Sequence, residues 1–127
     1  MRIFVTKVFR RWARKQKLDE EELLGAVREI EEGLIDAFLG GNLLKKRIAR
    51  KGQGKSGGYR TILAYRQEER TFFLYGFAKS EKENISKNDL RLLEEVGEEL
   101  LGYSDDELGF AVDSGALVEL EDEEGGE

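Results

Sequence analysis

Apolar residues near the amino terminus recur at the spacing of α-helices. Residues 2–6 resemble a strand. In the segment 7–18, apolar residues recur every three to four positions, and Arg and Lys occupy the other sides. This pattern predicts an amphipathic helix with a cationic face, capped by Thr6. Asp19 followed by Glu22 has the spacing of a capping box and predicts a second helix. The apolar positions are Val8, Phe9, Trp12 and Ala13 in the first helix, then Leu23, Val27, Ile30 and Leu34 in the second.

Beyond Gly40-Gly41-Asn42 the pattern takes on the period of β-strands. The predicted strands are residues 44–50, 59–66 and 70–78, with a glycine-rich loop at 52–58 and a hairpin connection at 67–69. The run FFLYGF in the last of these strands has large apolar residues at odd and even positions. We therefore expect that strand to be central in a sheet that is covered on both faces.

The last third of the chain predicts helices and then an edge strand. Ser86 and Ser104 each precede an acidic residue by three positions and a helical apolar stripe, the pattern of a capped helix. The segment ALVELE predicts an edge strand, and the charged terminus EDEEGGE a disordered tail. The expected fold class is α+β, a small twisted antiparallel sheet with mixed pairing at an edge, two amino-terminal helices and carboxy-terminal helices. We expect a main domain at 1–101 and an acidic extension at 102–127.

Composition removes several kinds of chemistry. The 127 residues include no Cys, His or Pro, which excludes a disulfide scaffold, a thiolate nucleophile, a Cys/His zinc site and a His general base, and we expect neither metal nor cofactor. No apolar run approaches the roughly 20 residues that span a bilayer, and the amino terminus does not resemble a secretion leader, so we expect a soluble cytoplasmic protein without membrane contact.

The charges are sorted into blocks of opposite sign. The net charge is −6, yet residues 37–82 carry eleven cations against three acids, and residues 83–127 carry two cations against sixteen acids. Because local potential decides what a surface attracts, the acidic total does not argue against a polyanionic ligand.

The stretch KKRIARKGQGKSGGYR at 45–60 is the most basic in the chain, with seven cations and no carboxylate. Its GQGKSG portion at 52–57 matches the spacing of a nucleotide-binding loop. Such a loop requires a helix to follow it, because the helix amino terminus holds the phosphates. A strand is predicted to follow here, so we interpret the glycines as a connection between two antiparallel strands.

A phosphodiester-binding surface is the alternative that the strand pattern favours. Side chains alternate along a strand, so Lys45 and Arg47 share one face, while Lys46, Ile48 and Arg50 point the other way. We expect Arg60 and Lys79 to converge with the first pair. Cations fixed on adjacent strands bind a phosphate backbone and stabilise the charge that develops when it is cleaved.

These residues resemble the toxins of the RelE/ParE superfamily, most closely the HigB-like branch. The resemblance runs through KKRIARKGQGKSGGYR, through the hairpin LAYR to FFLYGFAK, and through AKSEKENI at 78–85. It implies a metal-independent, ribosome-dependent endoribonuclease that cuts mRNA by in-line attack of the RNA 2′-hydroxyl on the adjacent phosphate. It also implies an antitoxin partner, often of the helix-turn-helix type, and contact with the ribosome and mRNA.

The resemblance assigns roles to individual cations. Arg60 is implied as the transition-state stabiliser, with Lys45 and Arg47 as backbone clamps and candidates for proton transfer, and Lys79 as a further catalytic cation. The implied RNA contacts are Arg50, Lys51, Lys55, Lys82 and Tyr59. Ser80 and Ser86 stand where well-known members have an arginine and a base-stacking tyrosine, so the general base is unassigned.

Two other functions stay open at this point. A ParE-like inhibitor of DNA gyrase has the same fold, and a module that binds RNA or protein without cleavage is consistent with the missing tyrosine.

The acidic carboxy-terminal region is either a solubilising tail or, in our hypothesis, an RNA mimic that folds over the basic sheet and lowers non-specific binding. The cationic face of the first helix is either solvated or in contact with ribosomal RNA.

Overall fold

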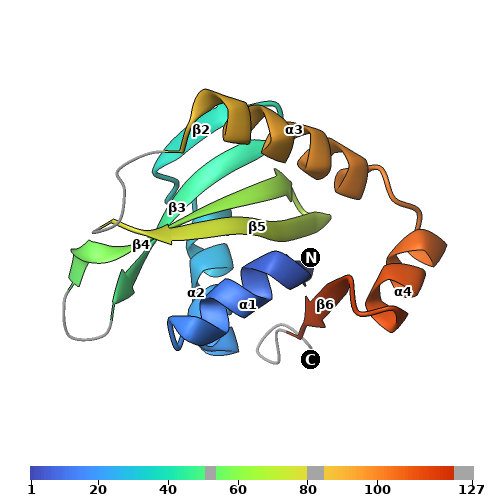
Figure 1. Cartoon of the computed structure of the whole chain (residues 1–127), viewed down its shortest axis with the longest axis horizontal. Helices are drawn as coiled ribbons and strands as arrows, with labels where there is room; N and C mark the ends of the chain where they lie inside the picture. The colour runs from blue at the N-terminus through green and yellow to red at the C-terminus, as the bar shows by residue number, and fades with distance from the viewer. Residues whose placement is uncertain (51–53, 80–84, 122–127) are drawn as a thin grey trace.

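The computed structural model describes residues 1–50, 54–79 and 85–121 (Figure 1). Helices and strands follow one another in separate runs, which is typical of an α+β protein, as the sequence predicts. In chain order the elements are β1 (Arg2–Thr6), α1 (Lys7–Lys15), α2 (Glu20–Glu31), β2 (Ala37–Gly40), β3 (Leu43–Arg50), β4 (Gly54–Arg66), β5 (Arg70–Ala78), α3 (Lys87–Leu101), α4 (Asp105–Asp113) and β6 (Leu117–Leu120).

The strands form one mixed sheet in the order β2-β3-β4-β5-β1-β6. Neighbouring strands are antiparallel except β1 and β5, which run parallel. The predicted hairpin between β4 and β5 and the central position of FFLYGF are confirmed, because β5 lies between β4 and β1. The predicted edge strand is also confirmed: β6 pairs with β1 and forms one edge of the sheet.

Both faces of the sheet are covered by helices, and each face has its own apolar core. Helices α1 and α2 lie on one face, and α3 on the other with α4 beyond it (Figure 1). The adjacent residues Phe72 and Phe73 of β5 point into different cores, as the period of two of a strand requires. Phe9 and Phe73 belong to the α1/α2 core, and Phe4 and Phe72 to the α3/α4 core.

Polar caps set the start of every helix in the described part of the chain. The hydroxyl of Thr6 accepts a hydrogen bond from the backbone N–H of Phe9 at 3.1 Å, so α1 begins directly behind β1. The predicted capping boxes at Asp19 and Ser104 are both present, and Ser86 caps α3. These caps confirm the predicted starts of all four helices.

Helix α1 ends earlier than its apolar pattern predicts. It stops at Lys15 because Lys17 takes a φ of 61°, which turns the chain so that Leu18 still enters the core. The buried face of this short helix is centred on Phe9 and Ala13, and Val8, one residue off that stripe, is 65% exposed. Val8 has the predicted helical spacing but lies outside the buried face of α1.

The second predicted stripe is likewise one turn too long. Helix α2 ends at Glu31, and Gly33 then takes a φ of 91°, which only glycine adopts readily. Leu34 follows this turn and lies largely in solvent, so it does not extend the stripe of Leu23, Val27 and Ile30.

Helix α1 packs unusually close to the sheet at Gly76 of β5. A Cβ atom built on Gly76 would lie 2.3 Å from the ring of Trp12, so only glycine leaves room for the indole. The same ring meets Phe9 and, edge-on, Tyr59. Gly76 is thus the point at which the sequence of β5 fixes the position of α1.

Two strand predictions need correction. Strand β2 was not predicted, because Phe38 at its centre is 77% exposed and the four-residue segment has no buried apolar face to mark it. Gly40 and Gly41, with φ of 103° and 56°, make the turn into β3. The predicted loop is shorter than expected, since β4 already begins at Gly54. Residues 52 and 53, and residues 122–127 of the predicted disordered tail, lie outside the described residues.

Candidate functional site

The pairing of β3 with β4 brings three of the predicted catalytic cations onto one face of the sheet. Arg47 lies directly opposite Arg60, and Lys45 lies opposite Ile62. Directly opposed residues of an antiparallel pair point to the same face, with Cβ atoms about 5 Å apart. Lys45, Arg47 and Arg60 therefore project together, on the face that α3 covers farther along the strands. The far ends of β3 and β4 extend beyond the helices (Figure 1).

Lys79 continues the same arrangement at the end of β5. Its backbone N–H donates to the carbonyl of Gly58 at 3.2 Å, which extends the β4–β5 ladder by one pair. Phe77 lies opposite Arg60, so alternation along β5 puts Lys79 on that face as well. Lys79 is exposed. Lys45, Arg47, Arg60 and Lys79 are called the basic face below.

Arg60 is the most unusual member of the basic face. It is only 9% exposed, and its Nη1 atom is buried without a hydrogen-bond partner among the described residues. Its neighbours in register are Arg47, which carries the same charge, and Phe77, which carries none. A buried guanidinium group with an unused donor is energetically costly, and an anionic ligand removes that cost.

Arg47 is held by a carboxylate that the sequence analysis did not single out. Asp36 accepts a hydrogen bond from Nε of Arg47 at 2.9 Å and a second from the Arg47 backbone N–H. Partial burial acts to raise the pKa of Asp36, but the two hydrogen bonds and the charges of Arg47 and Lys46 outweigh it, and the pKa lies below its ordinary value. Asp36 precedes β2, so its place beside β3 follows only once β2 is known.

Lys46 and Tyr59 point to the opposite face, as the alternation requires. Lys46 is buried, and its Nζ atom pairs with Oε1 of Glu29 at 2.6 Å and with the carbonyl of Leu34 at 2.8 Å. Tyr59 is 3% exposed and packs in the α1/α2 core. The structure places this predicted RNA contact in the core, away from the basic face.

Tyr75 is the tyrosine that shares a face with the cations. It lies opposite Ile62, which in turn lies opposite Lys45, and it is half-buried with its ring centroid 6.0 Å from that of Phe77. Aromatic side chains of this kind stack on nucleobases. Tyr75 therefore replaces Tyr59 as the candidate base contact.

A family model for the RelE toxin of the RelE/RelB toxin–antitoxin system matches residues 1–120. The chain belongs to the RelE toxin family. It is the toxin of a toxin–antitoxin system, and the family implies an antitoxin partner. The predicted superfamily is thereby confirmed, while the assignment to the HigB-like branch stays a prediction, as does the division at residue 101.

This RelE-family chain does not build a nucleotide-binding loop. The strand β4 begins at Gly54, inside the GKSGG segment, so a strand follows the glycines as predicted and no helix amino terminus meets them. Among the described residues, no group of three or more acidic side chains is placed to hold a metal ion. No helix in the described part of the chain is long and apolar enough to cross a membrane.

Several predicted RNA contacts of this RelE-family toxin cannot be placed relative to the basic face. Lys51 and Lys82 lie outside the described residues. Arg50 and Lys55 belong to β3 and β4, but the positions of their side chains are not described. The site as described therefore consists of the four cations, Tyr75, and Asp36 beside Arg47.

Proposed function

We propose that this toxin is an mRNA endonuclease that acts on the translating ribosome and binds the scissile phosphate on its basic face. Toxins of the RelE family are generally ribosome-dependent endoribonucleases, which supports the proposal. In the proposed reaction the RNA 2′-oxygen bonds to phosphorus while the bond from phosphorus to the 5′-oxygen breaks. The products are a 2′,3′-cyclic phosphate and a 5′-hydroxyl, and the proton of the 2′-hydroxyl is balanced by one delivered to the leaving oxygen.

The basic face supplies positioning and charge in this reaction. Arg60 donates from its free Nη1 to a non-bridging oxygen of the phosphate, where negative charge grows in the transition state. Lys45 and Arg47 clamp the backbone from β3, and Lys79 does so from the end of β5. Asp36 is a poor candidate for the general base, because its lowered pKa makes the carboxylate a weak acceptor of a proton.

The observation that carries the proposal is the buried Nη1 of Arg60, which has no hydrogen-bond partner in the part of the chain that the structure describes and lies opposite the like charge of Arg47. A purely structural arginine at such a position would have an acceptor, because unpaired buried donors are rare in folded proteins. A phosphate oxygen provides that acceptor and also separates the facing charges of Arg47 and Arg60.

Mapping mRNA ends on translating ribosomes tests the proposal. The purified wild-type chain, Arg60→Ala and a control, Arg66→Ala, are compared; Arg66 lies on the same strand at the hairpin end, away from the basic face. Cleavage that is lost in Arg60→Ala and kept in Arg66→Ala, with both variants folded, supports the proposal. Double-strand breaks in DNA without mRNA cleavage would instead indicate a gyrase inhibitor, and neither product would indicate a module that only binds.

A further inference from the structure

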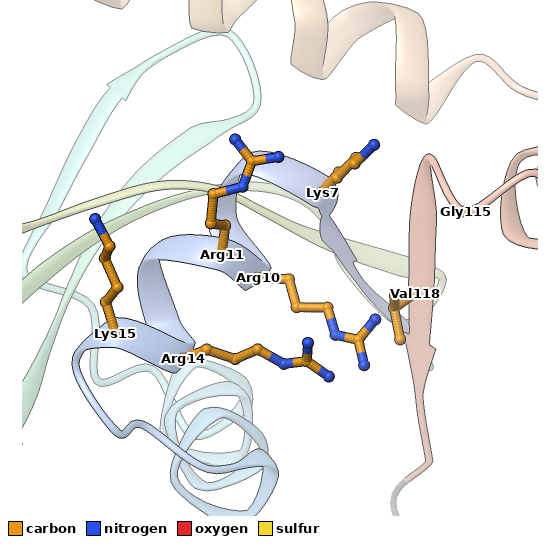
Figure 2. A pocket seen from close by; sticks show the side chains of 7 residues that line it. All are labelled: Lys7, Arg10, Arg11, Arg14, Lys15, Gly115 and Val118. Carbon is orange, nitrogen blue, oxygen red and sulfur yellow. The ribbon is translucent and has the colours of Figure 1, made fainter.

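A second cationic surface lies between α1 and β6, far from the basic face. It is a groove of about 400 Å³ whose cationic lining comes from one helix (Figure 2). Arg10 and Arg14 extend from α1 toward Val118 of β6, whereas Arg11 and Lys15 project from the other side of the helix (Figure 2). The five cations of this groove are Lys7, Arg10, Arg11, Arg14 and Lys15.

Within residues 1–50, 54–79 and 85–121, no carboxylate forms an ion pair with these cations. Each ion pair found within the described residues involves a cation outside α1. The five positions are spaced at three and four residues, so like charges face one another along the helix, and each such pair costs a few tenths of a kcal/mol. Only the last turn is favourable, because Arg14 and Lys15 lie at the negative end of the helix dipole.

The groove and the basic face lie on opposite sides of the sheet. Helix α1 packs against the core that contains Phe9 and Phe73, while Arg60 projects from the other side. Along the sheet, β6 is four strands from β3, or about 19 Å at the usual strand spacing. Strand β6, whose Val118 lines the groove, is therefore distant from β3, and this redirects our hypothesis about the acidic tail.

We propose that the acidic segment 121–127 occupies the α1–β6 groove and shields its cations from other polyanions. The segment holds five carboxylates and no cation, against the five cations of the groove. It directly follows Leu120, the last residue of the strand that forms one wall of the groove.

The length of the segment 121–127 and its direct attachment to β6 are consistent with its binding in the groove. The nine residues of α1 span about 14 Å, and six extended residues beyond Glu121 reach about 20 Å. A segment joined directly to the groove wall has an effective concentration in the millimolar range, so weak ion pairs suffice to keep the groove occupied. The segment then competes with nucleic acid at this surface and leaves the basic face free.

The test measures binding of a fluorescent single-stranded DNA 12-mer across a salt series. DNA lacks the 2′-hydroxyl that RNA cleavage requires, so the outcome is independent of the proposed nuclease activity. The full chain is compared with a chain that ends at Glu121, which keeps β6, and with Asp122→Asn/Glu123→Gln/Glu124→Gln, which keeps the length. We expect both to bind more tightly at low salt, with a log–log salt slope steeper by about 1.4 if two phosphate contacts are gained.

The groove itself is tested by combining these changes with Arg10→Gln/Arg14→Gln. In that background we expect truncation to change the affinity little, because the site of competition is gone. Lys87→Gln/Arg91→Gln removes the same charge from α3 and should preserve the effect of truncation. Equal binding by the full and truncated chains would overturn the proposal. An effect of truncation that persists without Arg10 and Arg14 would also overturn it, since the segment would then act elsewhere.

Discussion

The basic face and the α1–β6 groove both gather cations, but they hold them in different ways. On the basic face, neighbouring strands fix the cations, Arg60 is nearly buried, and Arg47 is held by Asp36. In the groove, one helix presents its cations to solvent without partners among the described residues. Fixed and desolvated charges suit an oriented, reacting phosphate, whereas exposed charges attract polyanions with little geometric preference. The first arrangement favours chemistry and the second favours exchangeable electrostatic binding.

Removing the buried cation should produce the largest effect. We expect Arg60→Ala to lower the rate of mRNA cleavage on ribosomes by a factor of roughly 10² to 10³, the usual cost of losing one preorganised donor to a developing charge. Arg60→Lys should recover only part of this loss, because an ammonium group cannot reproduce the planar fork of the guanidinium. Single-turnover rates provide the measurement, and a rate within a factor of about three of wild type would remove Arg60 from the chemistry.

The position of α1 can be disturbed without changing any charge. Gly76→Ala places a methyl group against the Trp12 ring, and we expect a loss of about 1 to 3 kcal/mol in the free energy of unfolding, with a shift in tryptophan fluorescence. Gly25→Ala is the matched control, since nothing lies within 4 Å of its added Cβ and alanine favours the interior of α2. Urea unfolding of both variants measures the difference. Equal stability of the two variants would mean that Trp12 moves aside freely.

The other wall of the groove depends on an ion pair between the first and last strands. Arg2 donates to Glu119 from Nε and Nη2, each at 2.9 Å, and the pKa of Arg2 is raised chiefly by this hydrogen bond. Because the pair is partly exposed, we expect Glu119→Gln to cost no more than about 1 kcal/mol. Thermal unfolding measures the loss, which should shrink in high salt. If the stability lost in Glu119→Gln does not change with salt, the loss comes from altered packing of β6 and not from the ion pair.

The two cationic surfaces also differ in how far the sequence predicted them. Alternation along β3 and β4 predicted that Lys45, Arg47 and Arg60 share a face, since the period of a strand fixes that relation once the register is known. The burial of Tyr59 depended on Trp12, which arrives from a helix 47 residues earlier in the chain. Asp36 was missed because β2 has no buried apolar pattern, and the groove was missed because it needs direct contact between α1 and β6, which lie at opposite ends of the chain. The periodicity of a strand therefore predicts which of its side chains share a face, whereas contacts between elements that are distant in sequence become known only from the folded structure.

The smallest expected effect concerns pH and Asp36. Its pKa is lower in the folded chain than its ordinary value of 3.8, so the charged form stabilises the fold above that value, and the contribution disappears as the pH falls through the lower, folded pKa. We therefore expect Asp36→Asn to be less stable than wild type at pH 7, and the difference to shrink as the pH falls below 3.8. Unfolding curves from pH 7 to pH 2 measure the difference, with Asp106→Asn, an exposed acid at the start of α4, as control. A difference that stays constant over this range would mean that the carboxylate charge contributes nothing, and that Arg47 is oriented by its strand alone.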